Sequence, residues 1–348
     1  MTEITIAGHS IGPKFPPFVI AELSANHNGE LSQALKIIDA AVEAGADAVK
    51  IQTYKPDTIT FKSDAPDFQI TEGLWAGRTL YDLYDWAHTP WEWHKALFSH
   101  AAKRGITLFS SPFDPTAVDL LESLAVPAYK IASFEAVDLP LIRYAASKGK
   151  PMIISTGMAN LEEIGEAVAA AHDGGCHEIA LLHCVSGYPA PAADYNLATI
   201  ADMAGRFGVP VGLSDHTLDN TTAIASVALG ASVIEKHMTL DRTGGGPDDS
   251  FSLEPGEFAT LCRDVRAAWE AVGRVDYGEK SSEAANVRFR RSLYFIKDIK
   301  AGETITEDCI RSVRPGYGLA PKHAPSLIGQ KITKDVGANT PVTKDAFV

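Results

Sequence analysis

One pattern of apolar and polar positions repeats eight times between residues 18 and 240. A short, mostly apolar run rich in β-branched residues ends in a polar or ionisable cluster and is followed by a stretch with helical spacing. The runs are FVIAELSAN (18–26), AVKIQTY (48–54), ITLFSSPF (106–113), AYKIASFE (128–135), PMIISTG (151–157), IALLHCVS (179–186), VGLSDHT (211–217) and VIEKHMTL (233–240). Eight strands alternating with helices over about 260 residues predict a (β/α)8 TIM barrel of the α/β class.

The polar clusters lie at the carboxyl ends of the predicted strands, the face on which such barrels carry their active sites. Their number and chemistry are typical of an enzyme. We therefore expect a single barrel mouth to gather Glu22, Asn26, Lys50, Gln52, Lys130, Ser133, Ser155, Ser214, His216, Glu235 and His237.

Strand alternation sharpens this expectation, because side chains two apart on a strand face the same way. It places Glu22, Ser24 and Asn26 on one face of the first run. Lys130 and Ser133 are three apart and would oppose each other on a regular strand. Either that strand ends at Ala132, or a β-bulge intervenes.

The repeating pattern ends with a helix predicted near 254–272, so we assign residues 1–273 to the barrel. Residues 274–290 have neither an apolar period nor a strand signature and are predicted to be a linker. Short apolar runs broken by Ala-Gly and Pro-Gly pairs then predict a small, loop-rich module over 291–348. Within the barrel, the long connection at 55–88 is expected to overhang the mouth as a lid or specificity loop.

Composition narrows the class of protein further. The net charge of −13 argues against a nucleic-acid or anionic-membrane surface. No window resembles a membrane span, and the N-terminus lacks the pattern of a secretory signal. The four cysteines show no metal-finger spacing and are interpreted as reduced thiols. We expect a cytoplasmic enzyme.

Three kinds of chemistry fit the predicted mouth. Strand-end lysines could form a Schiff base with a carbonyl substrate. Lys50 and Lys130, together with strand-end hydroxyls, could instead bind a phosphate and a carboxylate. His216 and His237 end neighbouring strands and could hold a divalent metal ion. The residues alone leave these three possibilities open.

Seven motifs, in order along nearly the whole chain, carry a family resemblance. They are AELSANHNG (21–29), DAVKIQTY (47–54), YKIASFE (129–135), ISTGM (154–158), GLSDHT (212–217), EKHMTLDR (235–242) and RPGYG (314–318). Together they resemble the sialic acid (nonulosonate) synthase family, which pairs a (β/α)8 barrel with a C-terminal antifreeze-like (SAF) domain. GRTLYDLYD (77–85), TPWEWH (89–94), FSSPFD (109–114) and FRRSLY (289–294) resemble the pseudaminate branch more than the N-acetylneuraminate branch.

The resemblance implies a condensation of phosphoenolpyruvate with an N-acetylated amino sugar. In the pseudaminate branch that sugar is 2,4-diacetamido-2,4,6-trideoxy-L-altrose, and neuraminate or legionaminate synthesis is the alternative. The resemblance also implies roles at matching positions. Phosphoenolpyruvate would be held by Lys50, Lys130, Ser133, Ser155 and Ser214, a divalent cation such as Mn²⁺ or Mg²⁺ by His216 and His237, and the sugar or metal-bound water by Glu22, Gln52, Tyr188 and Asp248.

Two further expectations follow from the resemblance. This chain has Ser186 where neuraminate synthases carry an Asn, so any substrate contact expected at that position would come from a serine hydroxyl. In the family the small C-terminal domain reaches a barrel mouth across a domain-swapped homodimer, which would bring Arg314 over the sugar pocket of the partner barrel. A Schiff-base aldolase and a non-catalytic antifreeze-like binding protein are the alternatives from other classes.

Overall fold

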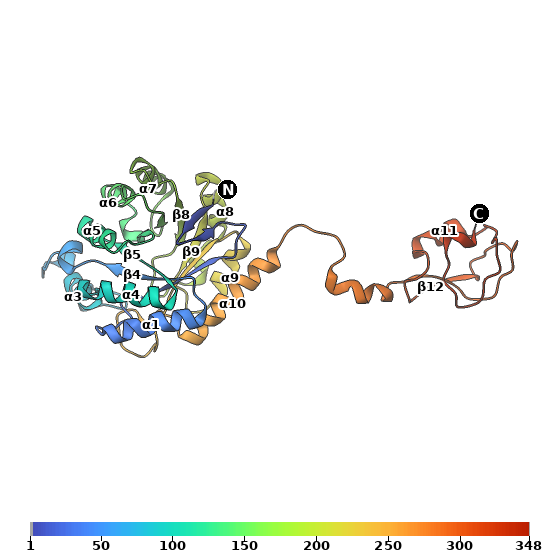
Figure 1. Cartoon of the computed structure of the whole chain (residues 1–348), viewed down its shortest axis with the longest axis horizontal. Coiled ribbons are helices and arrows are strands. Elements are labelled where there is room, and N and C mark those ends of the chain that lie inside the picture. Colours follow the sequence, from blue (N-terminus) through green and yellow to red (C-terminus); the bar gives the residue numbers. More distant parts are fainter. Residues whose placement is uncertain (1–2, 348) are drawn as a thin grey trace. The chain divides into compact units, whose positions relative to one another are not determined.

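The computed structural model describes residues 3–347 and divides the chain into two compact units (Figure 1). The first unit ends at Gly273 and the second begins at Arg274. A closed, parallel barrel forms the first unit, with the strand order β10-β3-β4-β5-β6-β7-β8-β9. Its strands are β3 (Phe18–Glu22), β4 (Ala48–Thr53), β5 (Thr107–Pro112), β6 (Tyr129–Ile131), β7 (Met152–Ser155), β8 (Ile179–Cys184), β9 (Val211–Asp215) and β10 (Val233–His237). The predicted (β/α)8 fold is confirmed.

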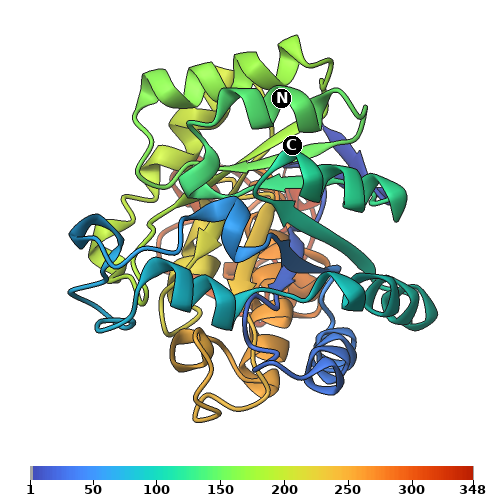
Figure 2. The ribbon, with the colours of Figure 1, turned by 90° about the vertical axis from the view of Figure 1, so that its left-hand side faces the viewer.

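Helices surround the strands, as Figure 2 shows, and each barrel strand is followed along the chain by a helix. These helices are α1 (Leu31–Ala44), α4 (His94–Arg104), α5 (Pro115–Ser123), α6 (Leu139–Ala146), α7 (Leu161–Asp173), α8 (Ala198–Phe207), α9 (Thr221–Ala228) and α10 (Pro255–Val272). Local chemistry fixes their ends. The Asn160 side chain accepts from the amides of Glu162 and Glu163, and the Glu163 carboxylate accepts from the Asn160 amide, so α7 begins with a capping box.

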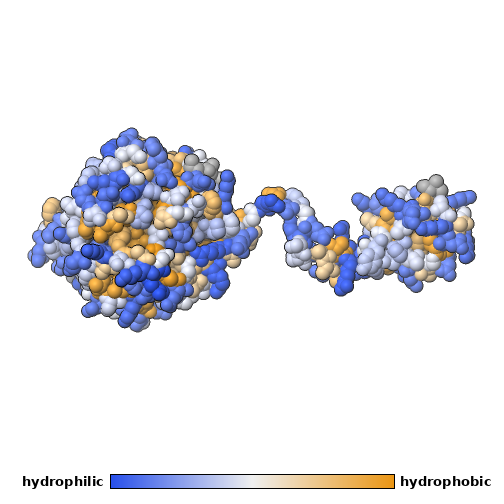
Figure 3. Space-filling model, viewed as in Figure 1, coloured by the Kyte–Doolittle hydropathy of each residue, from blue (hydrophilic) through white to orange (hydrophobic). Residues whose placement is uncertain are grey.

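The core fills the space between strands and helices, and the strands contribute most of their residues to it. Gly212 lets β9 approach β10, because a Cβ there would lie 2.3 Å from the carbonyl oxygen of Val233. Outside the core, Figure 3 shows hydrophilic residues interspersed with smaller hydrophobic patches on the visible face of the barrel unit. The strands therefore form a rigid support for the loops at their carboxyl ends.

One strand prediction needs correction. β3 ends at Glu22, and Ser24 lies in a left-handed turn with φ of 48°, so the prediction of one regular strand through Asn26 is wrong. Of the two alternatives left open for Lys130 and Ser133, the structure supports the early strand end, because β6 ends at Ile131 and a 3-10 helix at Ser133–Glu135 follows it. Lys130 and Ser133 can therefore serve one site, because the chain turns between them and strand alternation no longer applies.

The 55–88 connection contains regular structure that its sequence did not predict. It includes the short helix α2 (Pro56–Ile59), a 3-10 helix (Pro66–Phe68) and α3 (Leu80–Ala87). An N-terminal hairpin of β1 (Ile4–Ile6) and β2 (His9–Ile11) was also missed, because each strand has only three residues. Ile4, Ile6 and Ile11 bury their side chains in the barrel core.

The second unit has a small core of its own. A 3-10 helix (Ser281–Phe289) precedes an antiparallel pair, β11 (Ser292–Phe295) and β12 (Ile310–Val313), and the short helix α11 (Ala324–Leu327) follows. Further 3-10 helices are Pro321–His323 and Lys344–Ala346. Within residues 3–347, no helix is long and apolar enough to span a membrane.

Candidate active site

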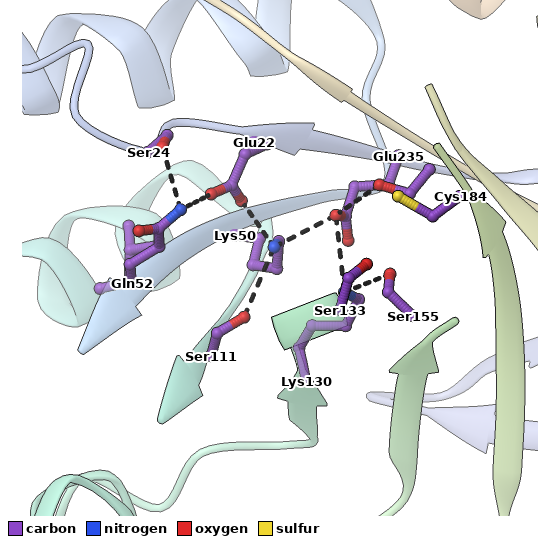
Figure 4. A network of polar contacts seen from close by, with 12 residues as sticks. Glu22, Ser24, Lys50, Gln52, Ser111, Lys130, Ser133, Ser155, Cys184 and Glu235 are labelled. Carbon is purple, nitrogen blue, oxygen red and sulfur yellow. Dashed lines mark hydrogen bonds and ion pairs between the residues drawn. The ribbon is translucent and has the colours of Figure 1, made fainter. Parts of the chain in front are cut away.

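Two lysines and two glutamates form a buried ion-pair network at the carboxyl ends of β3, β4, β6 and β10 (Figure 4). Lys50 Nζ lies 3.1 Å from both Glu22 Oε2 and Glu235 Oε1, and Lys130 Nζ lies 3.7 Å from Glu235 Oε1. Ser214 donates its hydroxyl to Glu235 Oε1 over 3.3 Å. Each of the four charged side chains is 5% exposed or less, so the network exchanges little with bulk water.

The buried charges perturb one another. Burial opposes ionisation of Lys50, but Glu22 and Glu235 outweigh it and raise its pKa. Burial likewise opposes ionisation of Glu235, but Lys130 and Lys50 lower its pKa. Burial dominates at the other two groups, raising the pKa of Glu22 to about 7 and lowering the pKa of Lys130 to about 8. Glu22 and Lys130 therefore gain or lose protons near neutral pH, which suits groups that bind an ionic substrate or move protons.

A hydrogen-bond relay extends the network to the loop after β10. Gln52 Nε2 donates to Glu22 Oε1 and to Ser24 Oγ, each over 3.0 Å. Ser24 Oγ in turn donates to Asp248 Oδ2 over 2.5 Å. Burial raises the pKa of Asp248, and the Ser24 hydroxyl partly offsets this. Gln52 and Asp248 thus lie on one continuous polar wall with Glu22.

A cradle of serines surrounds Gly157 beside Lys130. Lys130 Nζ donates to Ser155 Oγ over 2.7 Å, and the Gly157 amide donates to Ser133 Oγ over 3.2 Å. A Cβ on Gly157 would lie 2.4 Å from Ser186 Oγ and 2.8 Å from Ser133 Oγ. The absence of a side chain at Gly157 therefore lets three hydroxyls and a lysine converge. Such a set of donors can bind a phosphate or a carboxylate.

Sequence reasoning missed three residues of this site. Ser111 accepts a hydrogen bond from Lys50 Nζ over 3.4 Å. Glu135, on the 3-10 helix after β6, has a buried Oε2 without a hydrogen-bond partner, and burial raises its pKa to about 7 against the attraction of Lys130. Cys184 ends β8, with its sulfur 4.0 Å from His216 Nδ1. The polar ends of their runs were the signal that could have identified them.

His216 and His237 lie together at the ends of β9 and β10, with ring centroids 5.4 Å apart. His216 Nδ1 lies 2.8 Å from the carbonyl oxygen of Val185. A carbonyl only accepts, so Nδ1 carries the hydrogen and Nε2 keeps its lone pair. His237 Nδ1 is buried without a hydrogen-bond partner. The Tyr188 ring lies against both rings, tilted toward His216 with a centroid distance of 4.4 Å and edge-on to His237.

Two imidazoles with available nitrogens fit a divalent cation as a partial ligand set. In the part of the chain that the structure describes, no group of three or more His, Cys, Asp or Glu side chains is arranged to hold a metal ion. His216 and His237 would therefore supply two ligands and leave the remaining positions to substrate and water.

The structure does not bring every predicted residue into this network. The Asn26 amide donates to the Met238 carbonyl over 2.9 Å and to Ser252 Oγ over 2.8 Å, so it ties the loop after β3 to the segment after β10. Arg314 belongs to the second unit, on the turn after β12. All the residues of the network described above belong to the first unit.

The fold and the site together define a barrel protein with a buried, lysine-based anion cradle at the carboxyl ends of its strands. Comparison with known proteins identifies the family. The model of the NeuB family matches residues 37–277, and the SAF domain model matches residues 290–348. The chain belongs to the NeuB family.

Several relatives resemble the chain along most of its length. It is 46% identical to the pseudaminic acid synthase of Campylobacter jejuni strain 81-176, over 92% of this chain and 93% of that protein. It is 43% identical to the pseudaminic acid synthase of Helicobacter pylori, over 95% and 97% of the two chains. The crystal structure of N-acetylneuraminic acid synthetase from Leptospira borgpetersenii superposes with a TM-score of 0.73 at 32% identity, covering 83% of this chain and 96% of that one.

Proposed function

We propose that the protein is a pseudaminate synthase. It condenses phosphoenolpyruvate with 2,4-diacetamido-2,4,6-trideoxy-L-altrose and water to give pseudaminate and phosphate. The identity to two pseudaminic acid synthases over more than nine-tenths of the chain supports this choice among the nonulosonate products.

The observation that carries the proposal is the buried cradle of Lys50, Lys130 and the serines around Gly157. Phosphoenolpyruvate carries a phosphate and a carboxylate, and the chain as a whole has a net charge of −13. The two lysines are paired with two glutamates, but Glu22 is neutral below about pH 7 while Lys130 keeps its charge up to about pH 8. The buried network then has a net positive charge that can attract the substrate anion. The lysine amino groups and the neighbouring hydroxyls can hold its oxygens through charge-assisted hydrogen bonds.

The reaction forms one carbon–carbon bond and one carbon–oxygen bond to water, and it breaks the carbon–oxygen bond to phosphate. C3 of the enol attacks the aldehyde carbon of the open-chain sugar, and the aldehyde oxygen takes up a proton. The positive charge left at C2 is quenched by water, which loses a proton to the enzyme. The resulting tetrahedral centre expels phosphate by cleavage of the C2–O bond and becomes the 2-keto group.

Proton transfer needs a group that titrates near neutral pH and lies at the mouth. Glu135 satisfies both conditions, since its pKa is raised to about 7 and it lies on the 3-10 helix that follows β6 and also carries Ser133. Its Oε2 has no hydrogen-bond partner within the described residues. Glu22 has a similar pKa, but Gln52 and Lys50 already hold its carboxylate. We assign proton transfer to Glu135, and orientation of a sugar hydroxyl to Glu22.

A divalent cation held by His216 and His237 would polarise the aldehyde oxygen of the sugar. The bare Nε2 of His216 and the unpartnered Nδ1 of His237 support this assignment. Treatment with a chelator should abolish activity, and Mn²⁺ or Mg²⁺ should restore it. His237→Ala should fold normally, bind less metal in equilibrium dialysis and lose metal activation; full turnover of the metal-stripped wild type would contradict the assignment.

The decisive experiment offers phosphoenolpyruvate with a panel of amino sugars and measures phosphate release together with product mass. We expect phosphate and the mass of pseudaminate with the diacetamido trideoxy altrose, and little product with N-acetylmannosamine. Efficient use of N-acetylmannosamine would instead identify a neuraminate synthase. The panel should include the legionaminate precursor as a second comparison.

A Schiff-base aldolase is the second candidate, because the lowered pKa of Lys130 favours a neutral amine near pH 8. The ion pair with Glu235 and the hydrogen bond to Ser155 argue for binding instead. Borohydride added during turnover separates the two. An aldolase would be trapped as a covalent adduct on lysine, whereas the proposed synthase would give no adduct by mass.

A further inference from the structure

Trp75 lies on a solvent-exposed part of the 55–88 connection. A tight turn around it is closed by the Ile70 amide, which donates to the Arg78 carbonyl over 2.9 Å, and by the Gly77 amide, which donates to the Ile70 carbonyl over 2.9 Å. Residues 71–74, 76 and 77 are exposed, but Trp75 is half-buried. A large aromatic residue that is covered while its neighbours are exposed indicates a specific contact.

The other aromatic residues of this connection have partners elsewhere. Phe61 packs on Phe68, with ring centroids 6.2 Å apart. Lys62 lies over the Tyr81 ring at 5.3 Å, and Arg78 lies over the Trp86 ring at 4.3 Å. Each of these contacts joins two residues of the 55–88 connection itself. Tyr84 packs on the buried Tyr54, with ring centroids 5.8 Å apart.

Trp75 contacts the barrel mouth. Its indole Nε1 donates to the Pro247 carbonyl over 2.9 Å, on the loop that also carries Asp248. Its ring centroid lies 5.7 Å from that of Tyr188, which lies 4.4 Å from the His216 ring and 5.2 Å from the Phe251 ring. A row of rings therefore runs from the exposed connection to the two histidines.

This aromatic wall differs in chemistry from the rest of the mouth. The lysines, carboxylates and serines recognise charge and hydroxyl groups, whereas the rings of Trp75 and Tyr188 offer apolar surface. The buried Phe251 packs behind Tyr188. Apolar surface recognises a methyl group. The acceptor in the proposed function carries methyl groups on its two acetamido substituents and at C6.

We propose that Trp75 is a specificity-determining residue that forms the outer part of this wall and contacts a methyl substituent of the acceptor sugar. The inference rests on the proposed function and identifies the part of the sugar that the 55–88 connection contacts. The indole hydrogen bond to Pro247 holds the ring in place, so that the methyl group meets a fixed surface. Trp75 does not face the phosphoenolpyruvate cradle and should affect that substrate little.

Steady-state kinetics of Trp75→Ala, Trp75→Phe and Phe61→Ala test the assignment. Removing the ring should raise KM for the sugar about ten- to a hundredfold, the range expected for loss of a methyl-sized apolar contact. KM for phosphoenolpyruvate should stay close to the wild-type value. Trp75→Phe should recover part of the sugar affinity, and Phe61→Ala, an exposed control in the same connection, should behave as wild type. Equal increases in both KM values, or a matching loss in Phe61→Ala, would overturn the assignment.

Two substrate analogues decide which methyl group of the sugar Trp75 contacts. The sugar is compared with its 6-hydroxy analogue and with an analogue bearing formamido in place of acetamido. The wild type should discriminate against one of them in kcat/KM, and Trp75→Ala should lose that discrimination. If the wild type is active and Trp75→Ala keeps its full discrimination, the role of Trp75 is overturned but the proposed function stands. A wild type that releases no phosphate with any sugar would overturn the proposed function, and the role of Trp75 with it.

Discussion

At the scale of single residues, burial decides what each ionisable group at the mouth can do. Lys50 sits between two carboxylates and keeps its charge over a wide pH range. Lys130 is farther from Glu235, so the attraction of this carboxylate offsets less of the effect of burial, and the pKa of Lys130 is lowered to about 8. The two lysines of one cradle therefore differ in pH response, although their sequence contexts are alike.

This difference predicts a pH profile. Lys130 carries its charge below about pH 8 and loses it as the pH rises through that value, so kcat/KM for phosphoenolpyruvate should fall above pH 8. In Lys130→Arg the guanidinium stays protonated, and the alkaline fall should shift beyond the measured range even if the overall rate is lower. Lys148→Arg, a control whose half-buried side chain pairs with Asp119 outside the mouth network, should keep the wild-type profile. An unshifted alkaline limb in Lys130→Arg would assign the fall to another group.

Gly157 gives a second prediction at this scale. Its replacement by Ala places a Cβ within 2.4 Å of Ser186 Oγ and 2.8 Å of Ser133 Oγ, so the hydroxyls must move out of the cradle. KM for phosphoenolpyruvate should rise about ten- to a hundredfold, as expected for losing one charge-assisted contact to the anion. Gly205→Ala, where the added Cβ meets no atom within 4 Å, is the matched control. Wild-type KM in Gly157→Ala would show that the anion binds elsewhere.

At the scale of elements, a buried ion pair joins the ends of the neighbouring strands β9 and β10. We call this pair the clamp; its residues alternate along the strands with those of the mouth. Lys236 on β10 pairs with Asp215 on β9 at 2.6 Å and also donates to the Thr217 carbonyl over 2.7 Å. Both side chains of the pair are almost fully buried. Asp215 and Lys236 each precede a histidine of the mouth, so the clamp fixes the two strands that carry His216 and His237.

Breaking this clamp should destabilise the barrel. Lys236→Met leaves the Asp215 carboxylate buried and unpaired, which costs about 3–5 kcal/mol of unfolding free energy. Lys297→Met, which removes the exposed pair with Asp308, should change stability little. Denaturant unfolding of the full chain measures both. If the two variants lost equal stability, the Lys236 pair would not be the anchor of these strand ends.

At the scale of the whole molecule, the chain joins a large barrel unit to a small second unit that has a core of only about ten buried apolar residues. The first residues of the second unit are exposed, with Val275 and Tyr277 almost fully accessible. We propose, from the family resemblance, a domain-swapped homodimer in which Arg314 of one chain serves the barrel of its partner.

Complementation tests this arrangement. Arg314→Ala and Lys130→Ala homodimers should each be nearly inactive. A heterodimer of the two contains one barrel with Lys130 intact, served by a partner chain with Arg314 intact. Mixing should therefore restore up to about half of the wild-type activity per heterodimer, if the sites are independent. Heterodimers that form without recovering activity would mean that Arg314 serves its own barrel or has no role.

Much of the fold was determined by the sequence alone, because each barrel strand is nearly all apolar and ends in polar residues. That local pattern identified the eight strands, α10, and the strand ends that carry Lys50, Lys130, His216 and His237. Alternation failed where β3 ended at Glu22 and the chain turned at Ser24, because a left-handed turn leaves no signature in apolar spacing.

Only the tertiary structure decided which of these residues meet. The contacts of the site join positions that are distant in sequence. Lys50 pairs with Glu22 and Glu235, and the Trp75 ring contacts Tyr188. The burial of the Glu135 oxygen and the space beside Gly157 likewise depend on distant residues. Sequence periodicity reports how a residue relates to its own strand or helix. The pKa of a buried group and the wall of a substrate site depend instead on neighbours supplied by other strands, which only barrel closure brings within contact distance.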